Sequence, residues 1–255
     1  VGPDLPWAMG AAGWRDYLAD FHSDRPGITE EILAHTTDGA VDPYRWVAGQ
    51  IPPAAAVLDL ACGSAPLAPL HAGPWVGIDV SPAELERARE RGVAPVVLGD
   101  GSSLPFRSGS FDAVASSMAL MLIQPLDGAL AEVARVLRPG GRLVALLPGT
   151  KGLSAADLIR YGRLILALRS PLRYPNDRAL TDPGAALAAA GLSPVLDQHR
   201  RFECHVADAG TAARYVTSLY LPDVEPERVE QAVAVARRWV GHSIGVPLRL
   251  LVAER

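Results

Sequence analysis

The sequence predicts an α/β fold with a doubly wound, mostly parallel sheet, and three observations lead to this prediction. Short apolar runs that suit buried strands alternate with longer segments of helical periodicity. Three of these runs end in an aspartate, namely Asp59, Asp79 and Asp100. The C-terminal ends of the strands in such a sheet line one crevice, where ligands bind. A ligand long enough to contact all three carboxylates is therefore expected there.

The elements follow in order along the chain. Ser81 and Pro82 before AELERARERG indicate a helix with an N-cap, a proline in its first turn and a glycine stop. A second helix is expected over 126–138, ended by Pro139-Gly140-Gly141, and a third near 182–190. The strands are expected near 57–61, 75–80, 95–99, 111–117, 142–148, 194–206 and 246–253. The length of 255 residues suits a single domain, 1–255.

The turn after Asp59 is built from small residues. Ala61, Gly63 and Ala65 leave the backbone accessible to a ligand, and the next helix presents free N–H groups. Positions 61–66 read ACGSAP and do not match G-x-G-x-x-G, the pattern that binds a dinucleotide pyrophosphate. An acid before the loop instead suits a ligand with an ammonium group and no phosphate. These features disfavour a nicotinamide-dependent oxidoreductase.

Together, the motifs between 57 and 148 resemble those of the class I S-adenosylmethionine (SAM) methyltransferases, above all the type 11 methyltransferase domain. VLDLACGSA is similar to motif I of that family, GIDVSPAELERARE to motif II, and GDGSSLPFRSGSFDAVASSMAL to the motif that closes the adenine pocket. LAEVARVLRPGGRLVALLP is similar to its signature helix and fifth strand. The resemblance implies a Rossmann-like sheet whose last two strands form an antiparallel hairpin at the edge.

The resemblance also implies a role for each matching residue. Asp59 and the loop 61–65 would hold the methionine part of SAM, Asp79 the ribose hydroxyls, and Asp100 with Gly101 the adenine. Ser116 would lie beneath the sulfonium, and Tyr17 at the methionine end. The implied cofactor-binding set is Tyr17, Asp59, Ala61, Gly63, Ala65, Asp79, Val80, Asp100, Gly101 and Ser116. The alternative interpretation of each acid is an N-cap residue or a solvated strand end.

Two positions depart from the family pattern, since alanine stands at 61 and 65 where the family has glycine. The change at Ala61 is mild. Ala65 places a methyl group where the loop approaches the methionine part, so the departure bears on cofactor affinity more than on fold.

Three segments fall outside the 57–148 core, namely 1–50, 149–181 and 207–241, and they are expected to form a helical cap over the crevice. Only three of the fifteen Phe, Trp and Tyr residues lie within the core. The others can wall a substrate pocket or simply pack amphipathic helices. His22 lies in the aromatic N-terminal segment and is the candidate catalytic base, because histidine is the residue type suited to accept a proton from a phenol or hydroxyl.

Composition narrows the choice of partners. A net charge of −4 without basic clusters argues against nucleic acid. No apolar run is long enough to span a membrane and no signal segment opens the chain, so a cytoplasmic protein is expected. Two cysteines and no Cys/His cluster predict neither a disulfide framework nor a metal site. The expected assembly is a monomer or a homodimer.

The sequence thus predicts methyl transfer from SAM to an O, N or C atom of a small molecule, in the setting of natural-product biosynthesis. A second interpretation keeps the SAM site but changes the chemistry, as in cyclases or decarboxylases built on the same scaffold. The release of S-adenosylhomocysteine (SAH) from SAM with a cognate substrate distinguishes the two.

Overall fold

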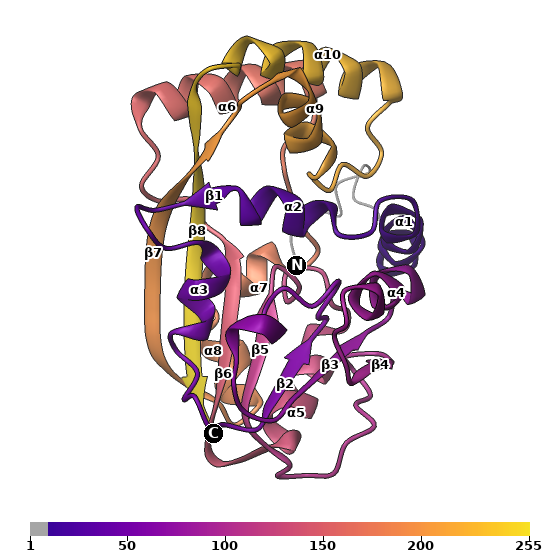
Figure 1. Ribbon diagram of the computed structural model, residues 1–255, viewed down its shortest axis with the longest axis vertical. Coiled ribbons are helices and arrows are strands. Elements are labelled where there is room, and N and C mark those ends of the chain that lie inside the picture. Colours follow the sequence, from indigo (N-terminus) through magenta and orange to yellow (C-terminus); the bar gives the residue numbers. More distant parts are fainter. Residues whose placement is uncertain (1–9) are drawn as a thin grey trace.

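The computed structural model describes residues 10–255, and its centre is one eight-stranded sheet (Figure 1). The strand order is β1-β7-β8-β6-β5-β2-β3-β4. Strands β2 to β6 run parallel to their neighbours in this group, whereas β8 is antiparallel to both β6 and β7. The predicted doubly wound sheet with an antiparallel pair near its edge is therefore confirmed. The strands are β1 (Thr36–Thr37), β2 (Val57–Leu60), β3 (Trp75–Asp79), β4 (Val96–Leu98), β5 (Phe111–Ser117), β6 (Leu137–Pro148), β7 (Ser193–His205) and β8 (Ser243–Glu254).

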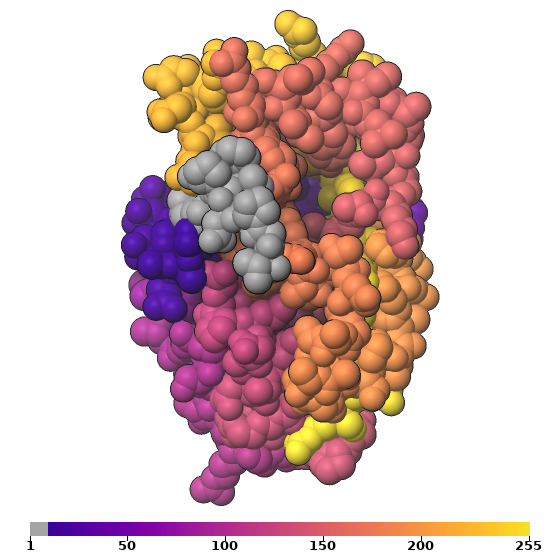
Figure 2. Space-filling view, turned by 180° about the vertical axis from the view of Figure 1, so that it is seen from behind, coloured from indigo at the N-terminus to yellow at the C-terminus, as the bar shows by residue number. Residues whose placement is uncertain are grey.

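Helices cover both faces of this sheet, and each face has its own apolar core. The α-helices are α1 (Ala11–Asp24), α2 (Ile28–Ala34), α3 (Pro43–Ala48), α4 (Pro82–Glu90), α5 (Leu126–Val136), α6 (Ala155–Leu168), α7 (Asp177–Thr181), α8 (Gly184–Ala189), α9 (Ala209–Thr217) and α10 (Pro226–Ala236). Two 3-10 turns complete the set, η1 (Ala68–Leu70) and η2 (Arg237–Trp239). On the side shown in Figure 2, α5 and α8 lie against each other over the sheet.

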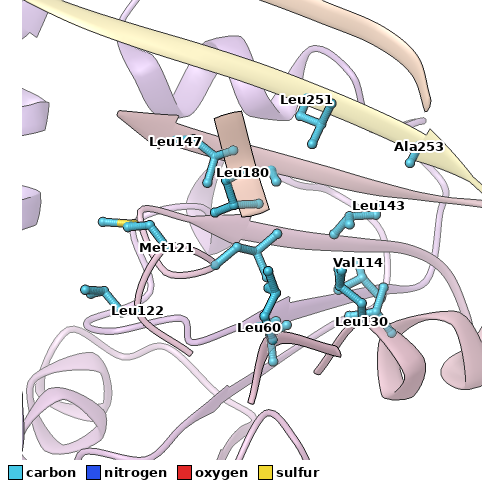
Figure 3. Close-up of a cluster of buried hydrophobic side chains, with 14 of the residues drawn as sticks. Leu60, Val114, Met121, Leu122, Leu130, Leu143, Leu147, Leu180, Leu251 and Ala253 are labelled. Atoms are coloured by element: carbon cyan, nitrogen blue, oxygen red, sulfur yellow. The ribbon is translucent and has the colours of Figure 1, made fainter. Parts of the chain in front are cut away.

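The side chains of the central strands point alternately to the two faces of the sheet, so that each strand contributes apolar residues to both cores. In β6, Leu143 and Leu147 face the core beneath α5 and α8, whereas Val144 and Leu146 face the core beneath α3. Figure 3 shows Leu143 and Leu147 in the first of these cores, which they share with Leu251 and Ala253 of β8. Successive side chains of a strand point to opposite faces, so an apolar run fills both cores at once. The buried sheet holds the strand ends, and hence the crevice, in place.

Two element boundaries differ from the sequence expectation. Helix α5 ends at Val136, and β6 begins at once, so Pro139-Gly140-Gly141 lies inside a strand rather than after a helix. The pairing register with β5 shifts there, and Gly140 has φ of +77°, which glycine adopts at little cost. The predicted helix near 182–190 begins after Pro183, and α7 precedes it as a separate short helix.

The upper cap, which we define as α6, α9 and α10, is carried by an extension of the sheet. Pairing between β6 and β8 stops at Pro148 and Leu248, but β7 and β8 remain paired as far as His205 and Ser243. This two-stranded ribbon rises beyond the crevice, with the three helices packed around its end (Figure 1). Their core includes Leu164, Leu168, Ala232, Ala236 and Trp239. No helix within 10–255 is long and apolar enough to cross a membrane.

The N-terminal segment does not act as one cap, which corrects the expectation for residues 1–50. Helices α1 and α2 lie at the crevice beside α4, but β1 adds an edge to the sheet and α3 packs beneath it. The reason is apolar burial, because Tyr44, Trp46 and Val47 of α3 are all buried in the core of that face. Residues 1–9 of the expected cap lie outside the described residues.

Candidate functional site

A large cavity of roughly 540 Å³ opens at the C-terminal ends of β2, β3 and β5. Its volume is in the range of small-molecule binding sites. Apolar walls come from Leu18, Leu60, Leu122 and Ile123, and polar groups converge from the strand ends and from α1 and α4. The lining residues include Trp14, His22, Tyr44, Asp59, Ala61, Gly63, Asp79, Val80, Glu84, Asp100, Gly101, Ser117 and Tyr220.

Asp59 is the most unusual acid of this cavity. It lies on β2 and is only 1% exposed, and its Oδ2 atom has no hydrogen-bond partner among the described residues. Burial, together with the nearby charge of Asp79, raises the pKa of Asp59 well above its usual value. An unpaired buried carboxylate oxygen is costly to the fold. A ligand cation that pairs with this oxygen would remove the cost.

The loop after Asp59 bends sharply, and three of its residues have a left-handed backbone. The φ angles are +53° at Ala61, +55° at Gly63 and +61° at Ala65. Glycine adopts this conformation freely, whereas in alanine it is less favourable by roughly 1–2 kcal/mol. The family pattern of glycine at 61 and 65 therefore has a conformational reason. Ala61 and Gly63 line the cavity, but Ala65 does not, so its methyl group does not narrow the site.

Asp79 ties this loop to the end of β3. Its Oδ2 accepts a hydrogen bond from the Gly63 N–H and its Oδ1 one from the Ser81 N–H, each at 2.8 Å. Burial raises the pKa of Asp79, although these two amide hydrogen bonds oppose the shift. Each oxygen keeps lone-pair capacity for a ligand hydroxyl. Asp79 thus fixes the loop geometry and remains available at the cavity wall.

The third acid is less buried. Asp100 is exposed, and its Oδ1 accepts hydrogen bonds from the N–H and the hydroxyl of Ser102, both at 2.8 Å. This local turn leaves Oδ2 free at the cavity edge, beside Gly101. Val80, on the same wall, is 71% exposed although it is apolar. An acid and an exposed apolar side chain at one rim suit a flat heterocycle with an exocyclic amino group.

Besides Ala65, two more residues of the predicted set, Ser116 and Tyr17, do not line the cavity. Ser116 is fully buried within β5 and does not line the cavity, whereas its neighbour Ser117 does. Successive side chains of a strand alternate, so a one-residue offset exchanges the two faces. Tyr17 packs between Trp14 and Phe21, and its Oη accepts the Leu221 N–H at 2.8 Å. Tyr17 therefore joins α1 to the segment after α9, while Trp14 lines the cavity.

His22 does line the cavity, and its ring is held from both sides. Its Nδ1 lies 2.9 Å from Oε1 of Glu84, and its Nε2 lies 3.4 Å from the Tyr220 hydroxyl. Glu84, on α4, is only 4% exposed. Sequence patterns alone indicated His22 but neither Glu84 nor Tyr220. Both come from distant parts of the chain and are brought together only by the fold.

The segments expected to form the cap contribute less to the cavity lining than the sequence suggested. Residues of 149–181 contribute nothing to the lining, and within 207–241 only Tyr220 does so. The segment from α1 to α2 instead closes the site, since Glu31 pairs with Arg87 of α4 and Glu30 with Arg91 just after that helix, each at 2.6 Å. These ion pairs fix the N-terminal helices beside the cofactor motifs.

The cavity fits the expected cofactor. The unpaired oxygen of Asp59 suits the ammonium of a methionine moiety, and Asp79 suits hydroxyl groups. Asp100, Gly101 and Val80 suit an adenine at the rim. Within 10–255, no group of three or more His, Cys, Asp or Glu side chains is placed to hold a metal ion.

Comparison with known proteins agrees with this fit. Residues 58–145 match the model of a family described as "Methyltransferase domain". The nocamycin O-methyltransferase of Saccharothrix syringae is 32% identical over 228 residues, covering 77% of this chain and 81% of that protein. The demethylmenaquinone methyltransferase of Corynebacterium efficiens is 44% identical over 129 residues. That match covers 49% of this chain and 56% of the relative, so the chain spans about half the length of such relatives.

Solved structures share the fold at low sequence identity. The YcgJ protein of Bacillus subtilis aligns over 82% of this chain and 98% of its own, with a TM-score of 0.54 and 21% identity. The [4+2]-cyclase SpnF aligns over 95% of this chain and 92% of its own, with a TM-score of 0.56 and 19% identity. At such identities the likeness concerns the architecture and not the reaction.

Proposed function

Because this chain belongs to the SAM-dependent methyltransferases of class I, we propose that it transfers the methyl group of SAM to an oxygen of a small molecule. The observation that carries the proposal is the buried, unpaired carboxylate oxygen of Asp59 at the end of β2. It lies in the same cavity as Asp79 and Asp100, the other two strand-end acids. When bound, SAM supplies an electrophilic methyl group on a sulfonium.

The protein residues then have three tasks. Asp59, Asp79 and Asp100 bind the ends and the middle of the cofactor, which fixes its orientation. The apolar walls and the helices α1 and α2 exclude water from the reacting groups. Holding two reactants in line can lower the activation free energy by roughly 7–11 kcal/mol. His22, which lines the same cavity, takes up the proton that an acceptor hydroxyl loses.

An oxygen acceptor is supported by the relative that aligns over most of its length, since its name describes an O-methyltransferase for nocamycin. We propose an acceptor of the same general class, a natural-product hydroxyl with an apolar body. The walls formed by Trp14, Leu18, Leu122 and Ile123 suit such a body.

Calorimetry with SAH tests the cofactor site directly. Micromolar binding, about −8 kcal/mol, is expected. Asp79→Ala should weaken it by roughly 1.5–3 kcal/mol, the range for hydrogen bonds to a charged group. The absence of binding by the unaltered protein would contradict the proposal.

Release of SAH from SAM in the presence of hydroxyl acceptors tests the reaction. His22→Ala should lower turnover by at least about 10²-fold and leave SAH affinity nearly unchanged. Conversion of an acceptor without SAH release would instead favour a non-methylating reaction on the same scaffold.

A further inference from the structure

Helix α4 starts with a pattern whose usual structure is only half formed, since the Ser81 hydroxyl accepts the Glu84 N–H at 3.4 Å but the reciprocal hydrogen bond is missing. Ser81 is the N-cap and Glu84 follows three residues later, which predicts a capping box with the Glu84 side chain accepting the Ser81 N–H. In the structure the Ser81 N–H donates to Oδ1 of Asp79 at 2.8 Å. The Glu84 carboxylate is thereby released from capping its own helix.

The released carboxylate turns toward the N-terminal helices. Both of its oxygens accept the Gly27 N–H at 3.0 Å, and Oε1 also lies 2.9 Å from Nδ1 of His22. Gly27 has φ of +76°, a left-handed conformation that glycine adopts at little cost, and an added Cβ would crowd the side chain of Arg87. The Gly27 N–H therefore fixes the orientation of the Glu84 carboxylate.

Glu84 and Asp59 line the same cavity but differ in their hydrogen-bond partners. Its oxygens already accept the Gly27 N–H and Oε1 contacts Nδ1 of His22, whereas Oδ2 of Asp59 has no partner among the described residues. A cofactor ammonium is therefore expected at Asp59 and not at Glu84. The partner that the fold gives to Glu84 is the imidazole.

This contact selects one tautomer of His22. An ionised carboxylate only accepts hydrogen bonds, so the neutral ring must carry its hydrogen on Nδ1. The lone pair then lies on Nε2, which faces the Tyr220 hydroxyl at the long distance of 3.4 Å. Both side chains line the cavity, so a substrate hydroxyl can displace this weak contact.

We propose that Glu84 is a positioning residue that fixes His22 as an Nε2 base for a hydroxyl acceptor; the inference rests on the methyl transfer proposed above. The acceptor oxygen forms the new C–O bond to the methyl group, and the electron pair of the broken S–C bond returns to sulfur. The hydroxyl proton passes to Nε2 of His22. The positive charge that leaves the sulfonium thus reappears on the imidazolium, which Glu84 stabilises.

The tautomer can be measured without any acceptor. Nitrogen NMR of the ¹⁵N-histidine-labelled protein, at a pH where imidazole is neutral, should show His22 protonated at Nδ1, with the signal assigned by His22→Gln. Free histidine prefers the other tautomer. In Glu84→Gln the amide can donate as well as accept, so the Nδ1–H preference should be lost. An Nε2–H ring in the unaltered protein would overturn the proposal.

Kinetics and cofactor affinity separate positioning from cofactor binding. Glu84→Gln should lower kcat by at least about 10²-fold, because an isosteric amide permits the wrong tautomer. Its SAH affinity should stay within about twofold, whereas Asp59→Asn should lower it at least tenfold. Equal losses of affinity would make Glu84 a cofactor ligand and overturn the proposal. An unchanged kcat would overturn it as well.

The two proposals fail in different ways. If SAH binds but no hydroxyl acceptor gives methylated product, the proposed methyl transfer is wrong, while the NMR experiment still decides whether Glu84 fixes the ring. If methylation occurs at nitrogen or carbon at a rate independent of His22, the role of Glu84 as the positioning residue of a base is wrong.

Discussion

Two buried aspartates, one in the crevice and one in the upper cap, have opposite surroundings. Asp59 is buried without a partner for Oδ2, and its pKa is raised. Asp157 on α6 is equally buried, but its oxygens accept hydrogen bonds from Arg201, from Ser154 and from the Gly245 N–H. Burial would raise the pKa of Asp157, yet these hydrogen bonds outweigh it and hold the pKa well below its usual range.

The contrast separates a functional acid from a structural one. In the cap, the carboxylate joins the start of α6 to β7 and β8, and every part of it is satisfied within the protein. In the crevice, Oδ2 of Asp59 can still accept a hydrogen bond or pair with a cation. A buried acid whose surroundings are incomplete marks the place where a ligand completes them.

The largest expected effect is the loss of the cap network. Asp157→Ala should destabilise the protein by about 3 kcal/mol, because it leaves the Arg201 guanidinium and the Gly245 N–H without their buried acceptor. Urea unfolding measures this change, with the exposed Asp20→Ala as the matched control. A loss no greater than that of the control would contradict the structural role of Asp157.

Asp59→Asn should act in the opposite direction on stability. SAH affinity should fall by roughly 1.5–3 kcal/mol, because the charge that pairs with the ammonium is removed. The ligand-free protein should become more stable by about 1 kcal/mol, since a costly buried charge is gone. Thermal unfolding with and without SAH measures both. A variant that is less stable than the unaltered protein would show that Asp59 supports the fold.

The pH dependence should differ between the two acids. The raised pKa of Asp59 means that its contribution to stability is present below the unfolded-state pKa and is lost as the pH rises through the folded-state value. The Tm advantage of Asp59→Asn should therefore grow as the pH rises above about 4, the usual pKa of an aspartate. Asp157 has a lowered pKa, so its contribution is present above about pH 4 and is lost on acidification. The Tm deficit of Asp157→Asn should accordingly shrink below about pH 4.

The smallest expected effect concerns backbone strain in the loop of the crevice. Ala65→Gly should stabilise the protein by at most about 1 kcal/mol, because relief of the left-handed conformation is partly offset by the greater freedom of glycine when unfolded. SAH affinity should change little, since Ala65 does not line the cavity. A large gain in affinity would mean that its methyl group does reach the cofactor.

The sequence was informative where the determinants are local. The parallel strands and the start of α4 followed from apolar runs, caps and turns within a few residues. Asp59, Asp79 and Asp100 line one cavity, as expected, because strand ends in such a sheet lie side by side. The placement of Ser116 failed because one residue of register exchanges the two faces of a strand. Sequence patterns cannot resolve that offset.

Glu84 was missed for a different reason. Its local pattern, Ser81 followed by Glu84, predicts a capping box, and the prediction is self-consistent within the helix. The structure overrides it through Asp79 and through Gly27, which lies 57 positions away in the sequence. The packing of α3 beneath the sheet likewise depends on a surface that forms only in the folded chain.

The short strand β1 sets a limit on how far the N-terminal helices can move. Thr36 and Thr37 pair with Cys204 and Glu203 at the outer edge of the β7–β8 ribbon. An uncovered edge offers unpaired N–H and C=O groups to any extended chain and invites aggregation. Any movement of α1 and α2 away from the cavity must end before Thr36 for this pairing to persist. Two threonines thus keep part of the ribbon edge covered whatever position these helices take.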